Sequence, residues 1–224
     1  MTICDVSYYQ NTIDSKNRIY GPIDWWKMAT RANGVIIRAG FGSNLDIQFV
    51  RNWNESKGVL KRGAYWYFKA DTSPIIQAEL LLQFAQEPEL PLAVDLEWRQ
   101  STDGLAAKPG AKYLGQVMEF LSTIEAAKHK PVIYSSMGHI LSYLPRPWNT
   151  STNYDMWAHL GDYDLWLAQY SKDPRITLAA PNVPQPWIDY WLWQCSADGN
   201  GLGKAYGVYS KSIDLNRESR NALP

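Results

Sequence analysis

Two carboxylates, Asp95 and Glu97, lie two positions apart at the end of the apolar run 91–98. Alternate residues of an extended strand point to the same face, so these two acids share one face of an expected strand. Each carboxylate repels the other's charge, and one of such a pair tends to keep a proton where an isolated acid is ionised. The pair can therefore provide a general acid beside an anion. An Asp-x-Glu can equally be an ordinary strand end that enters a polar loop.

The elements that position this pair read as repeated strand-then-helix units. Strands are expected at 3–7, 35–39, 63–68, 92–97 and 131–135, with helices at 25–32, 46–57, 74–86 and 111–128 between them. Asp24 and Ser73 are expected N-caps, the latter followed by Pro74 at the first helical position. This alternation predicts parallel strands joined by right-handed crossovers.

The alternation becomes irregular after residue 135. A short helix at 137–143 is expected to lead into an irregular excursion at 145–164, followed by strands at 165–169, 190–194 and 212–215 with little helix between them. This makes eight strands, and we find no repeat or linker that divides the chain. We expect one catalytic domain over residues 1–224, in the α/β class.

The expected strand ends carry side chains suited to chemistry on sugars. In a parallel barrel the βα loops and the active site lie at the C-terminal ends of the strands. Closing the barrel would gather four carboxylates around one mouth: Asp5, Asp95, Glu97 and Asp214. An acidic, aromatic cleft suits glycoside hydrolysis, which runs on carboxylates. Taken singly, Asp5 could instead fix the chain start, and Asp214 could cap a helical turn.

Composition narrows the class of partner. The 22 basic and 22 acidic residues leave no net charge, and no Lys/Arg run indicates nucleic acid or a membrane surface. The 11 Trp and 14 Tyr supply flat surfaces on which sugar rings could stack, although they are also compatible with an aromatic-rich core. The three His residues lack ligand spacing, so we expect no metal and no cofactor.

The first residues enter a strand directly, without the pattern of a signal peptide, and no apolar run is long enough to span a membrane. We therefore expect synthesis in the cytoplasm without membrane insertion. Cys4 and Cys195 are too few for a disulfide scaffold and are expected to be free, poorly reactive thiols. Cys4 should face away from the lumen because it precedes Asp5.

An ordered series of short motifs makes the chain similar to the family 25 glycoside hydrolases, lysozymes that cleave peptidoglycan between N-acetylmuramic acid and N-acetylglucosamine. The series includes residues 5–7, 23–25, 35–40, 63–67, 95–97, 131–134, 165–168, 193–194 and 213–216. The resemblance implies an irregular TIM-like barrel of five β/α units followed by three strands. It also implies Glu97 as general acid, Asp95 as its partner, and Asp5 and Asp214 as flanking acids.

Substrate contacts are expected from six further residues: Arg38, Tyr65, Tyr67, Tyr134, Trp166 and Gln194. The family resemblance is less close at Cys195, where many members carry an aromatic residue, and in the segments 148–164 and 197–212. The implied partner is bacterial peptidoglycan, attacked by a monomer after its release from the cell or from a virion.

The spacing of the two acids suggests a mechanism. Alternate Cα atoms on a strand are about 6.5 Å apart, so both carboxylates lie on the same side of a bound sugar. The 2-acetamido group of the substrate would then act as the nucleophile, with Glu97 protonating the leaving oxygen and Asp95 orienting the acetamido group, and the anomeric configuration would be retained. We expect Asp95 at the solvent-accessible mouth of the barrel.

Two alternatives remain open at this stage. A chitinase-like hydrolase also ends a strand in Asp-x-Glu, but the fuller Asp-x-x-Asp-x-Asp-x-Glu run of that family is absent here. A barrel that binds cell-wall glycan without cleaving it would belong to another class, and the presence of all four acids argues against it.

Overall fold

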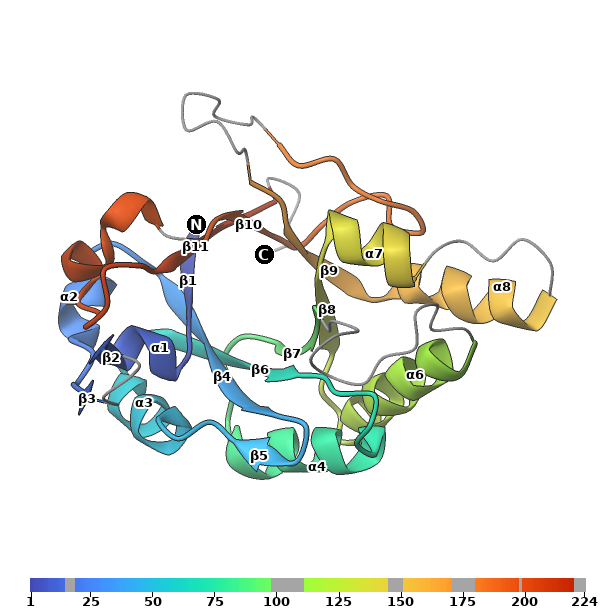
Figure 1. The fold of residues 1–224 in the computed structure, drawn as a ribbon, viewed down its shortest axis with the longest axis horizontal. Helices are drawn as coiled ribbons and strands as arrows, with labels where there is room; N and C mark the ends of the chain where they lie inside the picture. The colour runs from blue at the N-terminus through green and yellow to red at the C-terminus, as the bar shows by residue number, and fades with distance from the viewer. Residues whose placement is uncertain (15–18, 98–110, 145–150, 171–179, 198, 220–224) are drawn as a thin grey trace.

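The computed structural model describes residues 1–14, 19–97, 111–144, 151–170, 180–197 and 199–219. Trp98 and positions 145–150 of the expected excursion lie outside these ranges. A closed barrel of eight strands forms the centre of the molecule, with helices arranged around it (Figure 1). Its strands are β1 (Thr2–Val6), β4 (Gly34–Phe41), β6 (Lys61–Tyr67), β7 (Leu92–Leu96), β8 (Pro131–Ser136), β9 (Asp164–Ala168), β10 (Leu192–Ser196) and β11 (Asp214–Glu218). The expected eight-stranded, irregular TIM-like barrel is confirmed.

Barrel closure depends on β1, which pairs with β4 on one side and β11 on the other. The neighbouring strands from β1 through β4, β6, β7, β8, β9 and β10 are parallel, which the sequence predicts for the first five of them. The last strand is different: β11 runs antiparallel to both β10 and β1. The sequence pattern did not predict this direction, because the expected alternation of strands and helices becomes irregular after residue 135. A connection without a crossover helix returns the chain in the opposite direction.

Short accessory strands lie at the rim. Strand β5 (Asn44–Leu45) pairs antiparallel with the end of β4, and β2 (Thr12–Asp14) pairs with β3 (Ile19–Tyr20) in a separate two-stranded sheet. The helices are α1 (Tyr8–Asn11), α2 (Trp25–Ala29), α3 (Phe49–Ser56), α4 (Pro74–Phe84), α6 (Ala111–Ala126), α7 (Met137–Tyr143) and α8 (Ser151–His159). Three short 3-10 turns follow at Leu160–Asp162, Gly199–Gly201 and Gly203–Tyr206.

The helix starts follow local capping chemistry. Asp24 accepts a hydrogen bond from the backbone N–H of Lys27, and Ser73 accepts one from that of Ile76, so both predicted N-caps are confirmed. The region 145–164 is less irregular than expected, because Ser151–His159 is helical. The indole of Trp157 in α8 is buried and donates to the carbonyl of Leu144. Burial of this ring stabilises a helix that the local composition does not indicate.

Strand alternation divides the apolar residues into two cores. The lumen is filled by a small cluster that includes Ile3, Ile36, Val132, Trp166 and Leu192. The other faces of the strands pack against the helices in a larger outer core. Toward the C-terminal ends of the parallel strands the lumen positions become polar. The opposite end of the lumen is therefore filled by packed apolar side chains, and the mouth is lined by polar ones.

The two cysteines are free, as predicted. Cys4 is buried in the outer core and so faces away from the lumen, whereas Cys195 is half-buried and its thiol donates to the carbonyl of Leu215. Burial raises the pKa of both thiols. None of the helices in the described ranges is both long enough and apolar enough to cross a membrane.

Candidate active site

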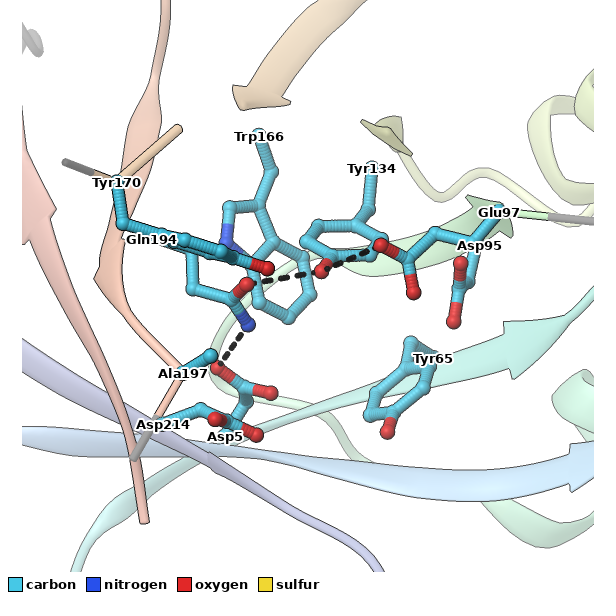
Figure 2. Close-up of a pocket in the computed structure, with 10 residues that line it drawn as sticks. All are labelled: Asp5, Tyr65, Asp95, Glu97, Tyr134, Trp166, Tyr170, Gln194, Ala197 and Asp214. Carbon is cyan, nitrogen blue, oxygen red and sulfur yellow. Dashed lines mark hydrogen bonds between the residues drawn. The ribbon is translucent and has the colours of Figure 1, made fainter. Parts of the chain in front are cut away.

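The mouth of the barrel contains a cavity of about 280 Å³ (Figure 2). Ten residues line it: Asp5, Tyr65, Asp95, Glu97, Tyr134, Trp166, Tyr170, Gln194, Ala197 and Asp214. All four predicted acids and four of the six predicted substrate contacts are therefore brought to one place. In Figure 2 the acids form two groups, Asp95 with Glu97 and Asp5 with Asp214, and the side chains of Tyr134 and Gln194 connect them.

Asp214 reaches this cavity for a reason that the sequence did not show. It is the first residue of β11, whereas the other strands bring their C-terminal ends to the mouth. Because β11 is antiparallel, its N-terminal end lies at that same mouth, and Asp214 pairs in register with Asp5 on β1. The expectation that Asp214 lies near the C-terminal end of a strand is wrong, but it does lie at the barrel mouth with the other three acids.

Asp5 and Asp214 form a hydrogen-bonded pair of acids. A hydrogen bond between two carboxyl groups requires a proton between them. Burial raises the pKa of Asp5 to about 6, although hydrogen bonds from Asn216, Gln194 and Asp214 oppose this shift. Asp5 is only 4% exposed, so desolvation of its charge exceeds the effect of its three partners.

Asp95 is more enclosed than expected. It is 3% exposed, so the prediction of a solvent-accessible position is wrong, and its Oδ1 has no hydrogen-bond partner among the described residues. Burial, followed by the charge of Glu97, holds the pKa of Asp95 well above its usual range, while the Arg38 guanidinium opposes this shift. Asp95 is the penultimate residue of β7, and its neighbours in register, Tyr67 and Tyr134, lie on the two adjacent strands.

Glu97 follows the last residue of β7 and is half-buried. The hydroxyl oxygen of Tyr134 is 3.3 Å from Glu97 Oε1 and 2.9 Å from Gln194 Oε1. The amide nitrogen of Gln194 donates to Asp5 Oδ2 at 3.0 Å. A chain of polar contacts therefore runs across the mouth from one group of acids to the other (Figure 2).

Two predicted contacts, Arg38 and Tyr67, do not line the cavity. Arg38 forms an ion pair with Asp46 at 2.9 Å, and its guanidinium lies over the rings of Tyr8 and Tyr9. Tyr67, the last residue of β6, is half-buried against the outer core. Arg38 lies near enough to influence the charge of Asp95, but its role in binding substrate stays a prediction.

Two functional candidates were missed. Tyr170 lies just after β9 and is 46% exposed at the cavity, and its position one residue beyond the expected strand 165–169 was a usable signal. Asn216, which is fully buried, donates to Asp5 Oδ2 at 2.8 Å and accepts from the indole of Trp166 at 2.7 Å. Its spacing of two from Asp214 places both on one face of the strand, and that periodicity could have identified it.

Within the part of the chain that the structure describes, no three His, Cys, Asp or Glu side chains are grouped as ligands for a metal ion. The site thus consists of carboxylates, aromatic rings and amides. The family model described as "Glycosyl hydrolases family 25" matches residues 4–204. The chain belongs to glycosyl hydrolase family 25. The resemblance noted in the sequence is confirmed.

The chain is also similar to individual proteins and solved structures. The chain is 32% identical over 158 residues to the uncharacterized protein YegX of Escherichia coli K12, covering 66% of this chain and 52% of YegX. It therefore spans about half the length of the curated relatives it matches. Among solved structures, the bacterial lysozyme of Streptomyces coelicolor matches with a TM-score of 0.74 at 22% identity, covering 99% of this chain and 93% of that one. The muramidase of Acremonium alcalophilum matches with a TM-score of 0.72 at 20% identity, covering 99% and 95%. At these identities the similarity shows a shared fold.

Proposed function

We propose that this family 25 protein is a lysozyme that hydrolyses the β-1,4 bond between N-acetylmuramic acid and N-acetylglucosamine in peptidoglycan. The observation that carries the proposal is the pairing of a half-buried Glu97 with a fully buried Asp95 at the mouth of the barrel. Family membership supports it, as do the names of two solved structures of the same fold, a bacterial lysozyme and a muramidase.

The two acids have different environments, and this suggests different roles. Glu97 is the more accessible of the two and acts as the general acid toward the leaving glycosidic oxygen. Asp95 is enclosed, and its Oδ1 lacks a donor among the described residues. The N–H of a substrate 2-acetamido group supplies such a donor. Rotation of the Asp95 carboxyl group exchanges the positions of its two oxygens, so either oxygen can accept this N–H.

The reaction proceeds in two steps. In the first, the acetamido carbonyl oxygen attacks the anomeric carbon, the bond to the leaving oxygen breaks, and Glu97 gives that oxygen its proton. Asp95 accepts a hydrogen bond from the acetamido N–H, and this bond strengthens as positive charge develops on that group. In the second step, water attacks the anomeric carbon from the opposite face and transfers a proton to Glu97. Two inversions give net retention, and no covalent bond to the enzyme is needed.

The walls of the cavity provide surface for sugar rings. Trp166 and Tyr134 are buried, and Tyr65 is half-buried, so little of each ring is exposed for stacking. Tyr170 presents much more of its ring to solvent and is the best stacking platform among the described residues of the site. All four acids come from one chain, so a monomer acting at the bacterial cell wall suffices for the proposed reaction.

Clearing of a purified cell-wall suspension tests the proposal. We expect Glu97→Gln to lower the rate by about 10²- to 10⁴-fold, the usual contribution of a general acid. Glu55→Gln, which changes an exposed glutamate on α3, should clear the suspension at the wild-type rate. Equal rates for Glu97→Gln and the wild type would exclude Glu97 as the acid, and a wild type that binds walls without clearing them would indicate a glycan-binding barrel.

Product analysis tests the bond and the mechanism separately. Mass spectrometry of the digest should show muramic acid at the new reducing ends, whereas glucosamine ends would indicate a chitinase-like specificity. An NMR time course should show the β-anomer first. If the α-anomer appears first, water attacks directly and the acetamido group is not the nucleophile.

A further inference from the structure

In the chain of polar contacts at the barrel mouth, Trp166 determines which groups donate hydrogen bonds and which accept them. An indole N–H donates and cannot accept, so the contact of 2.7 Å between Trp166 Nε1 and Asn216 Oδ1 identifies that atom as the amide oxygen. The amide nitrogen of Asn216 then points to Asp5 Oδ2 at 2.8 Å and to the carbonyl of Ile3 at 3.1 Å. The orientation of this buried amide is therefore fixed.

Gln194 continues the same direction. Its Nε2 donates to Asp5 Oδ2, the oxygen that already accepts from Asn216, so its Oε1 must face Tyr134. Gln194 is 4% exposed, and both ends of its amide are engaged within the protein. It was predicted to contact substrate, but this arrangement assigns it a different role.

Tyr134 has one hydroxyl proton and two neighbouring acceptors. Gln194 Oε1 at 2.9 Å is nearer than Glu97 Oε1 at 3.3 Å, and only a donor suits the amide oxygen. The proton of Tyr134 is thus directed to Gln194, and a lone pair of the phenol oxygen faces Glu97. A hydrogen bond can form there when Glu97 itself is the donor, which requires its protonated form.

We propose that Gln194 is a positioning residue that acts through Tyr134 to hold Glu97 in the protonated form before substrate is cleaved. This inference rests on the proposed function, in which Glu97 is the general acid. A general acid must carry its proton at the working pH. The Tyr134 hydroxyl has one proton and donates it to the amide oxygen of Gln194. No proton of Tyr134 is then left to stabilise ionised Glu97, so the protonated form of Glu97 is favoured.

Other groups also act on Glu97. Asp95 on the same strand and Tyr170 after β9 are electrostatically coupled to it, as is Tyr134 on β8. The acid pair from β1 and β11, Asp5 with Asp214, lines the opposite side of the cavity, and Arg38 from β4 acts on Asp95. A negative charge on Asp95 would favour protonated Glu97, and Arg38 acts on Glu97 through its effect on Asp95. Tyr134→Phe leaves the contacts among these groups in place, whereas Gln194→Leu also removes a hydrogen bond that lowers the pKa of Asp5. Comparing Gln194→Leu with and without Tyr134→Phe therefore isolates the effect of the hydroxyl direction.

The test is a carboxyl ¹³C NMR titration of Glu97 without substrate, with the resonance assigned by its loss in Glu97→Gln. We expect Tyr134→Phe to move the titration to lower pH by roughly half to one pH unit, because protonated Glu97 loses an acceptor. Gln194→Leu should move it further in the same direction, because the released Tyr134 hydroxyl then donates to the carboxylate. Adding Tyr134→Phe to Gln194→Leu should move it partly back.

A hydroxyl that already donates to Glu97 gives the opposite pattern. In that case Tyr134→Phe raises the titration midpoint and Gln194→Leu leaves it unchanged, and either result overturns the proposal. Tyr163→Phe is the matched control, because its hydroxyl donates to exposed Glu125 away from the cavity. If Gln194→Leu does not fold, the sign of the shift in Tyr134→Phe decides alone.

Activity gives an independent readout of the same effect. The alkaline limb of the kcat/KM profile on wall fragments should move to lower pH in both variants, in step with the NMR titration. A protein that clears no cell walls would refute the proposed function, while the titration would still show whether Gln194 controls the protonation of Glu97.

Discussion

Replacement of Asp5 by Asn should change how the stability of the protein depends on pH. The variant retains the local contacts, because an amide oxygen can accept the N–H groups of Gln194 and Asn216 that Asp5 Oδ2 accepts. The amide nitrogen of the new Asn side chain can donate to Asp214, and this hydrogen bond replaces the one formed by the proton that the two acids share. What disappears is the titration of a buried carboxyl group.

The size and sign of the effect follow from the pKa of Asp5, which rises from 3.8 to about 6 on folding, mainly through burial. Between these two pH values the folded protein holds a proton that the unfolded chain has released. Stability gained from this proton is complete below pH 4 and is lost as the pH rises through 6. A difference of about two pH units corresponds to about 3 kcal/mol. The titration belongs to the Asp5–Asp214 pair as a unit.

Urea unfolding of both proteins at pH values from 4 to 7 measures this directly. The unfolding free energy of Asp5→Asn minus that of the wild type should increase by about 3 kcal/mol across the range. Taking this difference cancels the titration of other groups and any constant cost of the substitution. A flat difference would show that Asp5 titrates alike in both states. A falling one would show that the hydrogen bonds from Gln194 and Asn216 exceed the cost of burial.

Three further variants or treatments test other parts of the structure. Asp95→Asn should lower kcat/KM by about 10²-fold or more. The unfolding free energy at neutral pH should stay equal or rise, because burial and Glu97 already disfavour a charge on Asp95. A loss of stability with retained activity would make Asp95 structural. Arg62→Met should lower the unfolding free energy by about 3 kcal/mol, since this guanidinium is 1% exposed and bonds two backbone carbonyls and a glutamate; an unchanged urea midpoint would contradict this. Cys4 and Cys195 should react slowly with a thiol reagent in the native protein, because the pKa of each thiol is raised. In denaturant without reductant two thiols should be titrated, because both cysteines are free, and finding none would reveal a disulfide.

The sequence by itself determined the features that depend on short-range periodicity. The two-residue repeat of a strand placed Asp95 and Glu97 on one face, and capping chemistry located the helix starts at Asp24 and Ser73. Alternating strands and helices indicated the parallel part of the barrel. The ordered motifs indicated the family, because many weak local matches in the right order are together specific.

Only the tertiary structure decided how distant segments meet. Antiparallel pairing of β11 brings the start of that strand, and Asp214, to the mouth. The depth of Asp95 and the contacts of Gln194 depend on which strands become neighbours. Local propensity does not encode strand direction or register over separations as long as the 189 positions from Asp5 to Gln194. Burial and hydrogen bonding are properties of the closed barrel, and they set the protonation of its acids.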